Sequence, residues 1–344
     1  MAIELYADYV TPAELTGYAR GALADRPENQ FQLLDVFPAE NVPDLNYRFN
    51  RGTDAGLLQA AAFRAFDAEP GFGKRDGLSR VTGELPAIGQ QYTLGEYDQL
   101  KLRNAEQEVR DLLLRDAVRI ARQIETRFEI ARGQALVEGK VTIAENDVYA
   151  EVDFGRSSSH SVAPSTLWSV HATATPLDDL QSWRDTYVAT NGAAPGRILT
   201  STAVRNHLLR CTQIIEMIYP LAASGSVGQV TVTMLNQLLS DFDLPAIEVY
   251  DAQVKTSTGT TQRVIAADKL IFLPPAGMPL GATLWGLTLE AQEPEYGIGA
   301  ADQPGIVVGA FKQKTTPITV FTVGSAIGLP IMANPDATLV ADVA

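Results

Sequence analysis

Apolar residues recur every three or four positions from residue 104 to residue 137, the most regular pattern in the chain. The recurring positions are Val109, Leu113, Ala117, Ile120, Ile124, Phe128, Ala131 and Ala135. This spacing places them on one face of an α-helix. Opposite charges one turn apart, Glu106 with Arg110 and Asp111 with Arg115, support the same element. About thirty residues at 1.5 Å each make a helix of roughly 45 Å, which we expect to pack on a sheet.

Strand patterns, with a period of two, flank this helix on both sides. Before it, Tyr47 and Phe49 alternate with polar residues. After it, Val141–Ile143 and Val148–Phe154 predict a hairpin that turns at residues 145–147.

Residues 57–98 predict a long hairpin excursion between the first strand and the helix. Its tip, residues 70–77, is rich in turn-forming and charged residues, and its returning arm spans residues 78–92. A loop of this length cannot bury much of its own surface. It is therefore either a flexible insertion or a loop that packs on a neighbouring chain.

Helical and strand patterns alternate from residue 176 to residue 300, which is typical of a mixed α/β domain. The predicted helices are Asp178–Thr190, Ala203–Leu209 and Val230–Phe242, and the predicted strands are Arg197–Thr200, Ile247–Tyr250, Arg263–Ala266 and Leu270–Leu273. In the third of these helices we expect Met234, Leu235, Leu238 and Leu239 to point inward. The end of the chain returns to strand patterns, at Ile306–Phe311, Ile318–Val323 and Thr338–Val340.

The first 42 residues have short helical stretches interrupted by Pro12, Pro27 and Pro38. This pattern favours an arm that lies along another surface over a compact unit. The segment is also acidic, because residues 1–46 hold eight acidic side chains against Arg20 and Arg26. Such an arm either contacts a basic surface or remains hydrated.

The whole chain is acidic, with a formal net charge of −14 over 344 residues and an apolar fraction of 46%. The apolar fraction is enough for a sizeable core. A strongly negative surface repels phosphate backbones, which disfavours an ordinary nucleic-acid reader. The same repulsion suits a container that holds DNA without binding it tightly, although a solvated acidic surface is the simpler explanation.

No motif for catalysis or cofactor binding is present, so we expect a non-enzyme without cofactors. The three histidines, His160, His171 and His207, do not form a zinc-protease motif, and ordinary hydrogen-bonded or solvent-facing roles are expected for them. Neither a nucleophile elbow nor a phosphate-binding loop occurs. Glu293 and Glu295 are interpreted as parts of an acidic loop.

Cys211 is the only cysteine, which excludes an intrachain disulfide and a cysteine-based zinc cluster. The first residues do not form a secretory signal. No segment reaches the ~20 uninterrupted apolar residues of a membrane span. These features predict a reduced, cytosolic setting with no membrane partner.

Several segments, taken in order, resemble one protein family. They are Arg103-Asn104-Ala105-Glu106, Gly139-Lys140-Val141-Thr142-Ile143, Val152-Asp153-Phe154-Gly155-Arg156, Ser325 to Leu329, and Asn334-Pro335-Asp336. In this combination the chain resembles the lambda-type major capsid proteins (capsid protein E) of tailed bacteriophages, which share the Hong Kong 97-type fold.

The resemblance implies an α+β phage capsid fold and a division of the chain into five parts. Residues 1–42 would be an N-terminal arm, 43–103 an extended β-hairpin loop and 104–169 a peripheral domain with a long spine helix and a sheet. Residues 170–300 would be an α/β axial domain, and 301–344 strands that return to the peripheral domain.

The function implied is that of a structural coat protein, assembled in the host cytoplasm into the virion capsid. Copies would self-assemble into hexamers and pentamers that form an icosahedral head around double-stranded DNA, which they would contact weakly and without specificity. The arm is too short to contain the scaffolding segment of some relatives, so a separate scaffolding protein is expected. A portal and a decoration protein are further partners in this family.

Two sets of residues are predicted to contact neighbouring subunits. At the loop tip they are Phe72, Gly73, Lys74, Arg75 and Asp76, and in the arm they are Tyr6, Tyr9, Tyr18 and Phe31. Some relatives are crosslinked through a lysine, but nothing around Lys74 indicates a partner or a catalytic acid, so no crosslink is expected.

Two alternatives to a phage coat protein remain open at this point. The nearer one is an encapsulin-like cellular shell of the same fold that stores a cargo enzyme. The other is an α/β hydrolase built on residues 170–300, which would require an apolar pocket with a perturbed titratable group.

Overall fold

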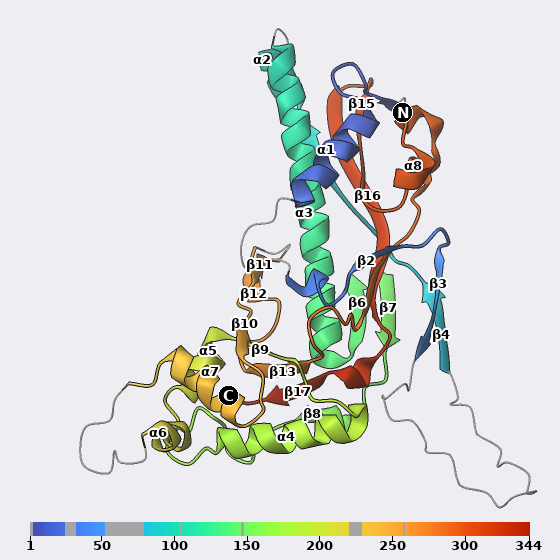
Figure 1. Ribbon diagram of the computed structural model, residues 1–344. Helices are drawn as coiled ribbons and strands as arrows, with labels where there is room; N and C mark the ends of the chain where they lie inside the picture. Colours follow the sequence, from blue (N-terminus) through green and yellow to red (C-terminus); the bar gives the residue numbers. More distant parts are fainter. Residues whose placement is uncertain are drawn as a thin grey trace, which may run out of the picture. The chain divides into compact units, whose positions relative to one another are not determined.

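The computed structural model describes residues 3–24, 32–51, 79–102, 105–145, 148–219, 229–256 and 259–344. The chain divides into two compact units, each made of separate stretches of sequence (Figure 1). The first unit comprises Met1–Arg48, Thr82–Gly133 and Ala282–Ile331, and the second comprises Phe49–Val81, Gln134–Gly281 and Met332–Ala344. Both units combine helices with sheet, as the sequence predicts. Residues 282–300, which the sequence assigns to the axial domain, belong to the first unit in this division. The division of the chain into five parts stays a prediction.

A six-stranded sheet forms the centre of the first unit. Its strand order is β1 (Ile3–Leu5), β15 (Val307–Gln313), β16 (Thr319–Met332), β14 (Gly281–Trp285) and β2 (Ala39–Asn41), with β5 (Ala87–Leu94) also paired to β16. β16 is antiparallel to β15 and to β5, and its Phe321 lies opposite Phe311 on one side and Thr93 on the other. The strands predicted near residues 306–311 and 318–323 are thus confirmed, and the second is longer than predicted.

The long predicted helix is confirmed as α3 (Glu106–Glu138), whose last residues from Gln134 fall in the second unit. Its inward positions Val109, Leu113, Ala117, Ile120, Ile124 and Phe128 are buried in one core with strand residues Val308, Ala310, Val320 and Ala326. The helix therefore packs on the sheet as expected. Gly324 makes this packing possible, because a Cβ atom there would overlap Cγ2 of Ile120.

The N-terminal segment contributes to the same core. Helix α1 (Pro12–Ala24) places Leu15 and Ala19 in it, with no exposed surface on either side chain. The hydroxyl of Thr16 donates to the carbonyl of Val308 at 3.1 Å and accepts from its amide at 3.0 Å. Much of the predicted arm therefore packs on the sheet of its own chain.

The opposite face of β15 is covered by α8 (Leu289–Gln292) and the 3-10 helix η4 (Pro294–Tyr296), where Ala291, Tyr296 and Val307 form a small second core. Shorter elements complete this part of the chain. They are β3 (Asn46–Arg51) paired with β4 (Ser79–Glu84), α2 (Glu96–Leu102), and the 3-10 helices η1 (Gln32–Leu34) and η5 (Ala300–Asp302).

The predicted excursion over residues 57–98 is only partly within the described residues, and its tip, residues 70–77, lies outside them. Its returning arm differs from the prediction. β5 pairs with β16 over eight residues, from Ala87 opposite Ile327 to Leu94 opposite Val320. From Ala87 onward the chain is therefore part of the main sheet. Its partly buried Ile88 and Tyr92 pack on the core beside α3.

The second unit contains a five-stranded sheet in the order β10 (Ile247–Val249), β9 (Arg197–Thr200), β13 (Lys269–Leu273), β17 (Leu339–Asp342) and β8 (Ser161–Val162). Its main helices are α4 (Pro176–Asn191), α5 (Thr202–Leu208), α6 (Thr212–Ile218) and α7 (Val232–Asp241). The predicted mixed α/β unit is confirmed. Two hydroxyls cap the helices, since the Oγ of Ser201 accepts from the amide of Val204 and the Oγ1 of Thr231 from that of Met234.

Two sequence predictions in this unit need correction. Met234 is 38% exposed, whereas Leu235, Leu238 and Leu239 are buried as expected, because Met234 lies on the outer side of α7. The strand predicted at residues 263–266 ends at Arg263. β12 (Thr261–Arg263) pairs there with β11 (Gln253–Lys255) in a two-stranded sheet.

The predicted hairpin after α3 is present as β6 (Lys140–Glu145) and β7 (Val148–Asp153), with Ile143 opposite Ala150. It is held to the end of α3 by Arg156, which donates to the carbonyls of Leu136, at 2.8 Å, and Val137. The 3-10 helices η2 (Ser158–His160) and η6 (Pro335–Ala337) connect the remaining strands.

Candidate assembly surfaces

Two of the arm tyrosines predicted to contact other subunits lie together on their own sheet. Tyr6 and Tyr9 meet edge to face with ring centroids 5.7 Å apart, and the ammonium of Lys312 lies 5.1 Å from the centre of the Tyr6 ring. Burial, together with the neighbouring Tyr9, raises the pKa of Tyr6 above its usual value. The amide of Tyr6 donates to the carbonyl of Ala310 at 2.8 Å, which extends the edge of the sheet.

Tyr18 lies apart from them, on α1, with 54% of its surface exposed. It lines an open hollow of about 500 Å³ with residues of α2 and the first turns of α3, namely Leu102, Glu108, Asp111, Leu112, Leu114 and Arg115. An ion pair between Glu14 and Arg110 joins α1 to α3 beside it. The lining of the hollow therefore combines apolar and charged side chains, as protein contact surfaces do.

Helix α2 exposes two large side chains on the first unit. None of its residues is buried, and Tyr97 and Leu100 are 69% and 61% exposed. They share one face, because they are three residues apart. The helix is anchored through Gln99, whose side-chain amide donates to the carbonyls of Leu94 at 2.9 Å and Ile318 at 3.0 Å. Sequence reasoning missed this surface, although two large apolar residues at helical spacing among acidic ones were a usable signal.

A buried charged cluster holds the N-terminal segment against α3. The guanidinium of Arg132, which has no exposed surface, donates to Glu125 at 2.8 Å and Glu129 at 3.0 Å. Its Nε donates to the hydroxyl of Thr283 at 2.9 Å, and that hydroxyl donates to the carbonyl of Phe37 at 2.9 Å. The amide of Leu33 donates to Glu129 at 3.3 Å. These contacts connect residues 33–37, α3 and β14, so they hold the last part of the N-terminal segment in the core of the first unit.

The remaining predicted contact residues, Phe31 in the arm and Phe72 to Asp76 at the loop tip, lie outside the described residues. Their roles stay predictions.

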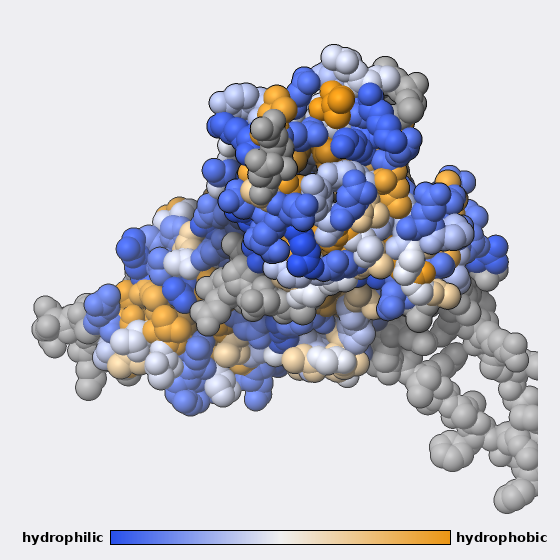
Figure 2. All heavy atoms as spheres, turned by 90° about the horizontal axis from the view of Figure 1, so that it is seen from above, coloured by the Kyte–Doolittle hydropathy of each residue, from blue (hydrophilic) through white to orange (hydrophobic). Residues whose placement is uncertain are grey.

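Apolar patches also occur on the second unit. Val170, Met217 and Met234 are each more than a third exposed. On the face shown in Figure 2, apolar residues gather beside the grey atoms at the left, over the end of this unit that carries α6 and α7.

Side chains of the types that catalysis or metal binding would use have structural partners or lie at the surface. His160 is buried and bonded at both ring nitrogens, to the carbonyl of Thr338 at 2.8 Å and the hydroxyl of Thr190 at 2.9 Å. Glu293 and Glu295 are exposed. In the described ranges, no three or more histidine, cysteine or acidic side chains are grouped so as to hold a metal ion. No helix of those ranges is both long and apolar enough to cross a bilayer.

A family model for the phage major capsid protein E matches residues 22–343, nearly the whole chain. The chain belongs to this family. It is therefore a coat protein that forms the head shell of a bacteriophage, a structural component of the virion capsid. The family and the mixed fold expected from the sequence resemblance are both confirmed.

Solved structures with the same fold include two phage-related proteins. A protein described as a prophage capsid protein from Escherichia coli CFT073 is 16% identical, with a TM-score of 0.63 over 96% of this chain and 99% of that one. A phage-related protein from Bordetella bronchiseptica RB50 is also 16% identical, with a TM-score of 0.58 over 99% of this chain and 98% of that one. No curated protein matches the chain.

Proposed function

We propose that copies of this coat protein form hexamers and pentamers that close into an icosahedral head around double-stranded DNA. The observation that carries this proposal is the family match over residues 22–343, which includes most of both units. Identical chains joined by head-to-tail contacts form rings when the rotation closes, and rings of two sizes can close a shell. In this role the protein acts through surfaces and has no catalytic function.

The proposed contact surface of the first unit consists of Tyr18, Tyr97, Leu100 and the hollow between α1, α2 and α3. Tyr97 and Leu100 are large apolar side chains, and each is more than 60% exposed. Burying such a side chain against a neighbour contributes about 1.5–3 kcal/mol. Contacts that are weak one by one become strong when a subunit touches several neighbours.

The loop tip, Phe72 to Asp76, and the arm residue Phe31 are proposed to add contacts of the same kind. A loop that extends from its own domain gains most by covering a neighbouring chain. We further propose that assembly takes place in the host cytoplasm with a separate scaffolding protein and a portal, and that decoration proteins are optional partners. The net charge of −14 agrees with only weak, non-specific contact to packaged DNA.

The test is electron microscopy of the purified full-length protein, expressed alone and with a candidate scaffolding protein, after sizing by analytical ultracentrifugation. Closed shells, or rings of five and six subunits, are the expected particles. A monomer or dimer under every condition would contradict the proposal.

The contact surface is tested in the same assay by Leu100→Asp, with Leu100→Met as the matched control that keeps the apolar area. Loss of about 1.5–3 kcal/mol at each contact raises the subunit concentration needed for assembly roughly ten- to hundredfold. The free subunit should keep its circular dichroism spectrum and melting temperature, because Leu100 is 61% exposed in it. Assembly of Leu100→Asp at the same concentration as Leu100→Met would exclude α2 from the contacts.

A further inference from the structure

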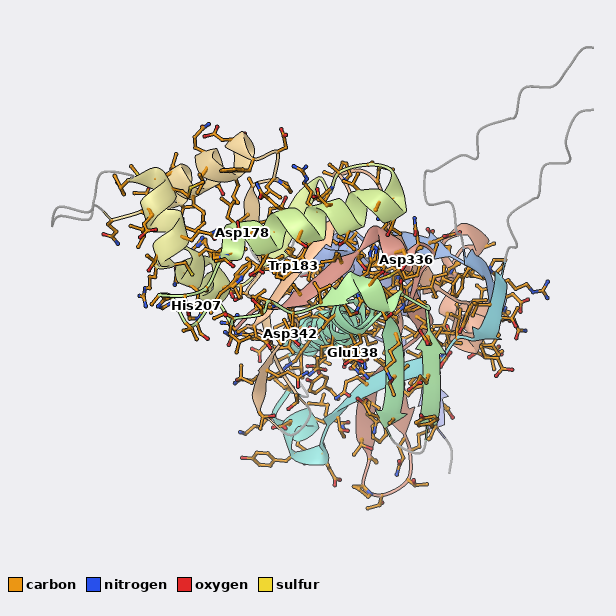
Figure 3. The ribbon with its side chains drawn as sticks, turned by 90° about the horizontal axis from the view of Figure 1, so that it is seen from below. Glu138, Asp178, Trp183, His207, Asp336 and Asp342 are labelled. Carbon is orange, nitrogen blue, oxygen red and sulfur yellow. The ribbon has the colours of Figure 1, made fainter. Side chains whose placement is uncertain are left out.

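The hollow between α1, α2 and α3 continues along α3 into a row of exposed arginines. Arg115 lines the hollow, and Arg119 and Arg122 follow it after four and three residues, so the three side chains share one face of the helix. In Figure 3 α3 is seen nearly end-on, from its last residue, Glu138. Within the described parts of the chain none of the three arginines forms an ion pair, and one acid, Asp116, lies near the first two.

The charges along this side of α3 are sorted by position. The acidic residues that line the hollow, Glu108 and Asp111, belong to the first turns of the helix and precede the arginines. Leucines of α2 and α3 supply the apolar lining between them. A complementary surface therefore needs an apolar side chain for the hollow and acidic side chains on the side toward Arg122.

The same chain carries such a surface on α8 and η4. Leu289 is 78% exposed, the largest exposed fraction of any large apolar side chain in the described ranges. Glu293 lies one helical turn after Leu289, and Glu295 follows it. Both carboxylates are exposed, and neither has an ion-pair partner among the described residues. The segment from Leu289 to Glu295 spans about 10 Å, which is also the length of α3 from Arg115 to Arg122.

The arginine row and the acidic segment lie on opposite sides of one sheet. On β15, Val308 and Ala310 belong to the core beside α3, whereas Val307 belongs to the small core with Tyr296 of η4. Figure 1 shows α3 and α8 on either side of β16. The two surfaces of one chain therefore cannot meet each other. Two copies can bring them together in a head-to-tail contact, which is the kind of contact that forms rings.

We propose that Leu289 of one copy enters the hollow of the next copy, with Glu293 and Glu295 against the arginines of α3. The inference rests on the proposed function, since it names the partner of the contact surface proposed there. The charges fix the direction of the contact. A segment docked the other way round would place its glutamates against Glu108 and Asp111, and facing like charges disfavour an interface. The unlike charges also offset part of the repulsion between copies that each carry a net charge of −14.

The test is a charge swap in the full-length protein, under the conditions in which the parent protein assembles. One variant reverses two arginines, Arg119→Glu with Arg122→Glu. A second variant reverses the two glutamates, Glu293→Arg with Glu295→Arg. A third variant carries all four substitutions and has the net charge of the parent. The subunit concentration needed for assembly is measured by analytical ultracentrifugation, and the particles are identified by electron microscopy.

Two controls separate the contact from general effects of charge. Glu40→Arg with Glu84→Arg changes the net charge as much as the second variant does, at two exposed acids elsewhere on the first unit. The apolar part of the contact is tested by Leu289→Asp, with Leu289→Met as the matched control. All the substituted side chains are exposed, so the free subunits should keep the circular dichroism spectrum of the parent.

Each of the first two variants, and Leu289→Asp, should need roughly tenfold more subunit for assembly than the parent, or more. The variant with all four substitutions and both controls should assemble within about threefold of the parent concentration. Reversal variants that assemble like the parent would overturn this contact and leave the proposed function intact, as would a combined variant that assembles no better than its two components. A parent protein that forms no particles would contradict the proposed function itself, and this contact with it.

Discussion

Replacing Arg132 with methionine removes the cation that pairs with Glu125 and Glu129 inside the first unit. The side chains of Arg132 and Glu129 are both completely buried, and that of Glu125 is 11% exposed. Removing one partner of a buried ion pair costs about 3–5 kcal/mol, because the remaining charge is left in a poor solvent. Arg132 is an ion-pair partner of both Glu125 and Glu129, so we expect a loss within that range.

The measurement is urea unfolding at neutral pH followed by tryptophan fluorescence. Of the three tryptophans, Trp285 is the one that reports on the first unit, because it lies in the core beside α3 with its ring centroid 4.4 Å from that of Phe128. The matched control is Arg122→Met, an exposed arginine on the same helix, which should change the free energy of unfolding by less than about 0.5 kcal/mol.

A double variant tests the stated cause. Glu129→Gln combined with Arg132→Met removes one buried carboxylate but keeps an oxygen that can accept from the amide of Leu33. It should be more stable than Arg132→Met alone, although it carries one more substitution. The argument fails if Arg132→Met costs no more than Arg122→Met, or if the second substitution adds a further loss.

Three other predictions concern separate features. Gly324→Ala should destabilise the first unit by about 1–3 kcal/mol in the same unfolding assay, because its Cβ would overlap Ile120. Gly17→Ala, in open space on α1, should instead stabilise the unit by about 0.5–1 kcal/mol. A smaller loss for Gly324→Ala would mean that the core can shift to accept the added methyl group. Burial, and secondarily Glu290, raises the pKa of Tyr296 to about 12, so the folded state favours the neutral phenol. The stability this contributes is complete below about pH 10 and is lost as the pH rises toward 12, so Tyr296→Phe should show a smaller decline over that range, and equal declines would exclude the phenol as the cause. Deletion of residues 70–77 should leave a soluble subunit but weaken shells, and unchanged shells in electron microscopy would refute a contact role for the tip.

The sequence was most informative where one periodicity dominates. The inward positions of α3 follow the helical period strictly, and every one of them from Val109 to Ala135 is buried. Likewise β9 has the bounds predicted for it, because four strand-forming residues lie between a turn and a helix cap.

Sequence reasoning failed where distant segments decide the environment of a residue. On α3, Glu125, Glu129 and Arg132 have the pattern of a solvated face, and only the packing of residues 33–37 and β14 makes them a buried cluster. His171 and His207 carry no local signal, since the fold of the second unit alone brings them together. The excursion predicted over residues 57–98 includes β5, because the strand that β5 pairs with, β16, lies more than 200 residues further along the chain.

The division of the chain into two units has a consequence for how such a protein can change by recombination. The backbone passes between the units at residues 48/49, 81/82, 133/134, 281/282 and 331/332. Each passage lies inside one element, in turn β3, β4, α3, β14 and β16. A crossover that exchanged one unit between related phages would therefore have to join two parental halves of a helix or strand at each border. New variants of either unit should arise by substitution and by insertion into loops, while the two units are inherited together.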